Sequence, residues 1–221
     1  MYKSTFGKSF NLNREGIFIL SLPLITIAYQ IIKPVKSFEL VAASLLLFLV
    51  APFSVSRFIL RENVFFLGIK RGNLIKGASG TILGWIIFYP ILNLLADQKD
   101  FQSFYPPFAE MRSGPWNLIA WEIAVMLPAF IGVQTFIFGY AYEGIRRMLG
   151  KSKTMLILSF VGIPLFYLGR PAVEIILASF AGLVACWIRS RSRSVLYPIL
   201  FGWGLSVILD ALVVYKLLIG D

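Results

Sequence analysis

The stretch GVQTFIFGY, residues 132–140, lies in a long apolar run and decides how the chain is interpreted. Gln134 and Thr135 place polar side chains at a depth where a bilayer makes them costly. The apolar run extends on both sides, over about 116–145, which exceeds the roughly 20 residues that a membrane-spanning helix needs. The stretch therefore predicts a membrane helix with an amide whose position requires an explanation.

Six further apolar blocks accompany this run, at about 16–33, 38–57, 77–96, 154–169, 172–188 and 195–216. Hydrophobic residues make up 58% of the 221 residues, whereas soluble domains contain about half. We therefore expect an all-α, polytopic membrane bundle of about seven transmembrane helices. The whole chain, 1–221, is expected to form a single transmembrane domain without a soluble appendage.

Two prolines are expected to modify the predicted spans. Pro128 is expected to kink the 116–145 run or to divide it into an interfacial piece and a span. Pro164 is expected to break the 154–169 block or to make it re-entrant.

The basic residues indicate an orientation. The formal net charge is +10, from 21 Lys and Arg against 11 Asp and Glu. With the N-terminus in the cytoplasm, 15 of the 21 basic residues fall in inner segments, as the positive-inside rule requires. Because these charges lie in short loops and form no single basic face, they do not indicate a nucleic-acid partner.

The side chains that most often carry out catalysis are scarce. The chain has no histidine and one cysteine, Cys186. An intrachain disulfide is therefore excluded, and so are the commonest zinc ligand and the commonest general base. We expect no metal site.

The candidates for ionisable groups at membrane depth are Glu122, Glu174 and Asp210, with Arg170 at a helix end. Such groups usually face protein or a water-filled cavity. Arg170 and Glu174 are four residues apart, a spacing that lets two side chains meet on one helix face. The four residues are interpreted as a candidate buried polar cluster that either holds helices together or forms a substrate or ion site.

The segment 97–115 mixes charges with aromatic residues. Amphipathic rings collect at the membrane–water interface. We expect an interfacial belt there, formed by Phe104, Tyr105, Phe108 and Trp116.

From about 64 to 218, the chain resembles the CPBP family of CAAX-protease and bacteriocin-processing membrane proteins. The resemblance lies in NVFFLGIKRGNLIKG (63–77), FQSFYPPFAEMRSGPWNLIAWEIAVML (101–127), IPLFYLGRPAVE (163–174) and SVLYPILFGWGLSVILD (194–210). It implies an intramembrane protease frame whose active site holds a glutamate, an arginine in an FRG triplet and two histidines.

The chain departs from the family at each of these active positions. Gln134 stands at the glutamate position and Phe138 at the arginine position of the triplet, while Tyr167 and Gly202 stand at the two histidine positions. An amide cannot take up a proton at neutral pH, and a phenol has a reference pKa near 10. If 154–169 formed one straight helix, Tyr167 would lie near its outer end, away from Gln134 and Gly202. A re-entrant block would bring the three together.

The resemblance and its departures predict a catalytically inactive CPBP-like protein, a pseudoprotease. It would act as a binding or scaffolding subunit, or as an assembly factor, for a membrane-protein complex in a prokaryotic plasma membrane. The expected partners are other integral membrane proteins and lipids; no cofactor is predicted, although contact with a lipid or lipophilic cofactor is allowed. One alternative is a hydrolase or protease with shifted chemistry that uses Glu122, Glu174 and Asp210. Another is a small transporter or lipid-binding protein.

Overall fold

The structure is a computed structural model that describes residues 12–32, 36–62, 67–106, 109–168 and 170–219. Within these ranges every regular element is helical, which agrees with the expected all-α class. The N-terminal half contains α1 (Leu12–Ile32), α2 (Ser37–Leu45), η1 (Leu46–Val50), α3 (Ala51–Ser54), η2 (Val55–Ile59), α4 (Leu74–Leu95), α5 (Lys99–Phe104) and η4 (Ala109–Ser113). The remainder contains α6 (Pro115–Trp121), η5 (Glu122–Met126), α7 (Leu127–Gln134), η6 (Thr135–Ala141), α8 (Tyr142–Leu149), α9 (Lys151–Ile157), η7 (Leu158–Gly162), η8 (Pro164–Tyr167), α10 (Ala172–Ser192) and α11 (Leu196–Ile219).

Five helical stretches in the described residues are long and apolar enough to cross a bilayer. They are Ser37–Ile59, Leu74–Leu95, Pro115–Leu149, Ala172–Ser192 and Leu196–Leu217. Of the two other apolar blocks, 16–33 appears as a shorter apolar helix, Gly16–Ile32. The chain is thus a multi-pass helical membrane protein with at least these five candidate spans.

The helix from Pro115 to Leu149 is the central element of the fold. It runs without interruption through α6, η5, α7, η6 and α8, so Pro128 does not divide it. Proline lacks the N–H that an α-helical turn requires, and here a wider π-helical turn, η5, lies directly before it. At about 1.5 Å per residue the helix is roughly 50 Å long, which exceeds the roughly 30 Å hydrocarbon core of a bilayer.

The 154–169 block is broken, as one of the two expectations for Pro164 required. An α-helix and a π-helical turn, α9 and η7, end at Gly162, and a short 3-10 helix, η8, follows from Pro164 to Tyr167. The chain then turns into α10. The side chain of Gln30 in α1 donates to the carbonyl of Leu165 at 3.0 Å, which ties the broken segment to the first helix.

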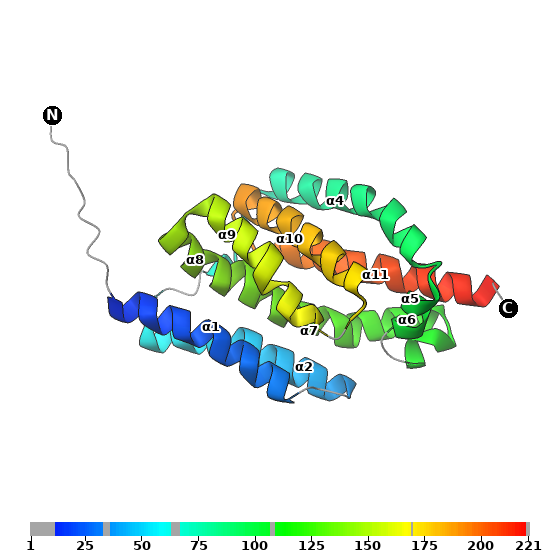
Figure 1. The fold of residues 1–221 in the computed structure, drawn as a ribbon, viewed down its shortest axis with the longest axis horizontal. Coiled ribbons are helices and arrows are strands. Elements are labelled where there is room, and N and C mark those ends of the chain that lie inside the picture. Colours follow the sequence, from blue (N-terminus) through cyan, green and yellow to red (C-terminus); the bar gives the residue numbers. More distant parts are fainter. Residues whose placement is uncertain (1–11, 33–35, 63–66, 107–108, 169, 220–221) are drawn as a thin grey trace.

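The helices form an elongated bundle in which α1 and α2 lie along one side and α4 along the opposite side, with α7, α10 and α11 between them (Figure 1). Helix α4 packs closely on α11 and α10, and α7 packs on α2 and α11. A Cβ atom at Gly84 would collide with the Phe201 ring, so glycine permits the close approach of α4 to α11.

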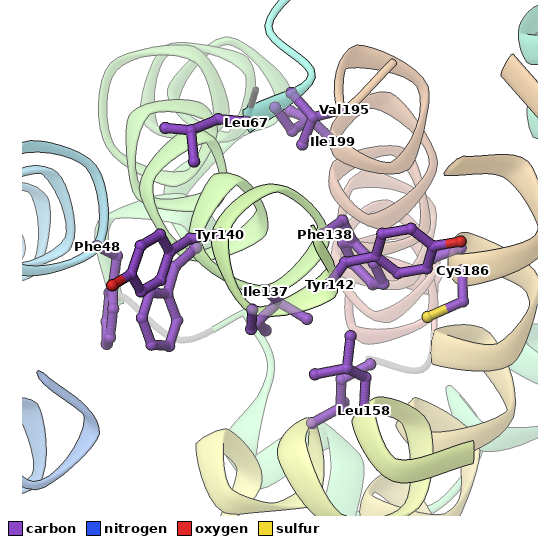
Figure 2. Packing of buried hydrophobic residues seen from close by; sticks show 14 of the residues in the cluster. Phe48, Leu67, Ile137, Phe138, Tyr140, Tyr142, Leu158, Cys186, Val195 and Ile199 are labelled. Atoms are coloured by element: carbon purple, nitrogen blue, oxygen red, sulfur yellow. The ribbon is translucent and has the colours of Figure 1, made fainter. Parts of the chain in front are cut away.

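Buried aromatic side chains surround the π-helical turn η6. Figure 2 shows Tyr140 with Phe48 on one side of this helix, and Phe138 with Tyr142 on the other. The Phe48 and Phe136 ring centroids are 5.2 Å apart, within the range of favourable aromatic pairs. The stretch that carries Gln134 is therefore fixed by packing on both of its sides.

Candidate binding cavity

A partly open cavity of about 240 Å³ lies between α7, α10 and α11, and residues of α1, α2, α4, α5 and η8 also line it. Ligand sites in helical proteins commonly lie between packed helices in this way. The four degenerate family positions all line it: Gln134, Phe138, Tyr167 and Gly202. Tyr167 is the last residue of the short helix η8 that follows the break at Pro164, and from there it reaches the same cavity as the other three.

Gln134 and Gly202 meet directly inside the cavity. Gln134 is the last residue of α7, and Gly202 lies in the first half of α11. A Cβ atom at Gly202 would collide with Nε2 of Gln134, so the amide packs on the bare backbone of α11. The Oε1 atom of Gln134 is buried and has no hydrogen-bond partner among the described residues.

Phe138 is held from its backbone by a buried arginine. The side chain of Phe138 is only 1% exposed, and its carbonyl accepts a hydrogen bond from Nε of Arg189 at 2.9 Å. The Nη2 atom of Arg189 donates to Oε1 of Glu143 at 2.7 Å, and the guanidinium carbon lies 5.4 Å from the centre of the Tyr142 ring. This network fixes the wall of the cavity at the basic end of the central helix.

The opposite end of the cavity is polar. The guanidinium of Arg170 lies 3.4 Å from Oε1 of Glu174 and donates to the hydroxyl of Tyr105 at 2.8 Å. The Tyr105 hydroxyl in turn donates to the same carboxylate oxygen of Glu174. Burial raises the pKa of Tyr105 well above its ordinary value of 10, the charge of Arg170 opposes this shift, and that of Glu174 adds to it. The phenol is therefore a hydrogen-bond donor at neutral pH.

The residues interpreted as one polar cluster divide into two pairs. Arg170 and Glu174 line the cavity, but Glu122 and Asp210 do not. Those two side chains are 2% and 0% exposed, and their carboxyl groups lie close to each other. Two buried carboxyl groups at such close range are not both ionised, so we expect them to share a proton.

Two side chains of α11 contact one oxygen of each carboxyl group. Nε1 of Trp203 donates to Oε2 of Glu122 at 2.9 Å, and the Ser206 hydroxyl lies 3.4 Å from Oδ2 of Asp210. The pair thus joins the central helix to α11. Within the described ranges, no group of three or more Asp, Glu, Cys or His side chains could hold a metal ion.

The sequence interpretation missed several residues of the site. Tyr105 was expected in the interfacial belt, but it is 7% exposed and bonded to Glu174, so that expectation was wrong for this residue. Trp116, at 81% exposed, suits the belt, and Phe108 lies outside the described residues. Arg189, Glu143 and Ser44 are also part of the site or its wall. Of these, only Glu143, an acidic residue at the end of an apolar run, offered a signal in the sequence.

Comparison with protein-family models, with curated proteins and with solved structures finds no match to this chain. The class that the fold and the site define is a multi-pass helical membrane protein with a largely apolar internal cavity that is polar at one end.

Proposed function

We propose that the chain is a non-catalytic relative of the CPBP membrane proteases. It binds other membrane proteins and does not cleave peptide bonds. In this proposal it serves as a binding or scaffolding subunit, or as an assembly factor, of a membrane-protein complex in a prokaryotic plasma membrane. Its N-terminus is cytoplasmic, and α1 together with the α9–η8 segment completes seven membrane segments.

One observation carries the proposal: the four positions at which the chain departs from the family lie on the wall of one cavity. A shared wall is what four residues of a former active site require. The amide of Gln134 cannot act as a base, and Phe138 and Gly202 offer no ligand or proton acceptor. The phenol of Tyr167 has a reference pKa near 10 and is a weak base at neutral pH.

The alternative of an enzyme with shifted chemistry needs its carboxylates at a place that a substrate can reach. Glu174 meets this condition because it lines the cavity. Glu122 and Asp210 do not line the cavity, whereas a general acid or base has to lie within hydrogen-bond reach of the reacting group. This geometry favours binding over hydrolysis.

Purification from its native membrane in mild detergent tests the proposal. We expect another integral membrane protein to co-purify in stoichiometric amount, and we expect the pure chain to leave membrane peptides and prenylated peptides intact. Peptide-bond cleavage by pure protein that a chelator abolishes would overturn the proposal. A monomer that carries tightly bound metal would argue against it as well.

Restoration of the family's residues tests the alignment itself. We expect the parent protein to bind no stoichiometric zinc, and the quadruple variant to bind one zinc ion per chain by elemental analysis. The four substitutions are Gln134→Glu, Phe138→Arg, Tyr167→His and Gly202→His. A folded quadruple variant without zinc would remove the support that these positions give to the proposal.

A further inference from the structure

The cavity lining contains buried oxygens without a hydrogen-bond partner among the residues that the structure describes, and two of them, on Gln134 and Glu174, can only accept. Three oxygens of its lining residues have no hydrogen-bond partner in the described part of the chain: Ser44 Oγ, Gln134 Oε1 and Glu174 Oε2. Ser44 is 0% exposed and Glu174 is 5% exposed. Buried polar atoms in native proteins nearly always have a partner. These oxygens therefore indicate a ligand that donates hydrogen bonds.

The carboxylate of Glu174 at the polar end also requires a ligand that donates hydrogen bonds. A carboxylate accepts hydrogen bonds and cannot donate. Oxygen Oε1 of Glu174 already accepts from Tyr105 and Arg170, which leaves Oε2 for a ligand. Because the charge of Arg170 is matched by Glu174, an anionic group would gain little net attraction at this end.

One face of α10 gives the cavity its length. Glu174, Ala178, Ala181, Gly182 and Ala185 all line the cavity, and their spacing of three and four residues places them on one side of the helix. From Glu174 to Ala185 the helix rises by roughly 16 Å. Three alanines and one glycine along this face leave room for an elongated group beside the helix, and this channel has Glu174 at its polar end.

The rest of the channel is apolar. Leu92, Phe101, Met126, Val133, Leu177 and Leu205 contribute to its wall. At about 240 Å³ the cavity exceeds the roughly 150 Å³ engineered apolar cavity that binds benzene in another protein. An elongated apolar body with a small polar head matches both the walls and the end.

We propose that this cavity binds a membrane amphiphile whose head is a hydrogen-bond donor, a hydroxyl or an amine, with the head at Glu174 and the apolar body along α10. Lipids whose heads only accept hydrogen bonds, such as quinones and ethers, would leave Gln134 Oε1 and Glu174 Oε2 without a donor, so we expect them to bind more weakly. The inference rests on the proposed non-catalytic function, since it requires a ligand that stays intact in the cavity.

A photoreactive long-chain alcohol with an alkyl diazirine tests the proposal on the unaltered protein in detergent. We expect the label to map to peptides of α10, α7 and α11 that line the cavity. Two competitors of identical composition, 1-octanol and heptyl methyl ether, differ in the hydroxyl donor alone. We expect the ether to need at least a tenfold higher concentration than octanol to reduce labelling by half.

Two variants and a control locate the ligand. Glu174→Gln is expected to reduce the octanol preference below threefold, and Ala181→Leu is expected to abolish labelling by filling the channel. Ser179→Ala is the matched control, because Ser179 lies on α10, bonds to the carbonyl of Ile175 and does not line the cavity. A thermal melt of each variant shows whether it is folded.

Equal competition by octanol and ether in the parent protein would overturn the ligand class. Labelling confined to lipid-facing surfaces, without competition, would show that water alone fills the cavity and would also overturn it. The two proposals fail separately. A preference for octanol without any co-purifying membrane protein supports the ligand and counts against the scaffold function, whereas a partner without the preference does the reverse.

Discussion

The substitution Glu143→Ala is expected to destabilise the protein strongly, because it leaves the charge of Arg189 buried and unpaired. Arg189 is 4% exposed, and its ion pair with Glu143 has an N–O distance of 2.7 Å. Removal of one partner of a buried pair costs about 3–5 kcal/mol. For a chain of this size, each kcal/mol corresponds to about 2–4 °C, so we expect the melting temperature to fall by roughly 6–20 °C.

Two comparisons isolate the effect of burial. The ion pair between Glu62 and Arg147 has an arginine side chain that is 50% exposed. Glu62→Ala is therefore expected to cost at most about 1 kcal/mol. Arg189→Met is expected to cost less than Glu143→Ala, because the remaining carboxylate keeps two hydrogen bonds from Arg146, at 2.9 and 2.7 Å.

The assay is a thermal melt of each purified variant in one detergent, monitored by intrinsic tryptophan fluorescence. Salt is a useful second variable, since exposed pairs are screened far more than buried ones. We expect 0.5 M NaCl to leave the deficit of Glu143→Ala unchanged. If Glu143→Ala melts no lower than Glu62→Ala, then the Arg189 network does not hold the wall at Phe138 as we have argued.

Three further substitutions give distinct expected results. Asp210→Asn supplies an amide donor to Glu122, so its melting temperature is expected within about 4 °C of the parent's, whereas Asp210→Ala is expected to lose about 1–3 kcal/mol. The raised pKa of Tyr105 implies a contribution to stability that is complete below about pH 10 and is lost as the pH rises through the folded-state value. Tyr105→Phe is therefore expected to flatten the loss of stability in melts above pH 10, and an unchanged slope would contradict this assignment. Gly144→Ala places a methyl group against the Phe18 ring, and it is expected to cost about 1–3 kcal/mol and to speed proteolysis within α1.

Hydropathy predicted the membrane class and located the long helices. The expected block at 172–188 lies within α10, and that at 195–216 begins one residue before α11 and otherwise lies within it. Roughly 20 apolar residues in a row leave few alternatives to a spanning helix. The outcome at the prolines was harder to predict. The helix continues through Pro128, which follows a π-helical turn, whereas the helix before Pro164 ends there. Whether a proline interrupts a helix depends on how the surrounding segments pack, which the local sequence does not show.

Two signals pointed to cavity residues: a residue type out of place in an apolar run, and the family resemblance, which named Phe138, Tyr167 and Gly202. Gln134 was identified as a candidate because an amide is costly in an apolar run, and it lines the cavity. Tyr105 and Ser44 gave no such signal, since tyrosine is ordinary near an interface and serine is ordinary in a membrane helix. Their place in the site depends on how α5 and α2 pack on distant segments, which a local pattern does not encode.

The contact between Gln134 and Gly202 has a consequence for any attempt to convert this cavity into a catalytic one. Because the amide occupies the space that a Cβ at position 202 would need, Gly202→His alone forces Gln134 off the α11 backbone. Neighbouring substitutions of this kind are coupled and do not add. The strain at 202 would disappear only if the side chain at 134 adopts a different rotamer, and Phe130, the next nearest neighbour, limits the room for it. Gln134 and Gly202 thus form this part of the cavity wall from an uncharged amide packed on a bare backbone. Such a wall can contact a bound ligand, but it has no group that could activate water.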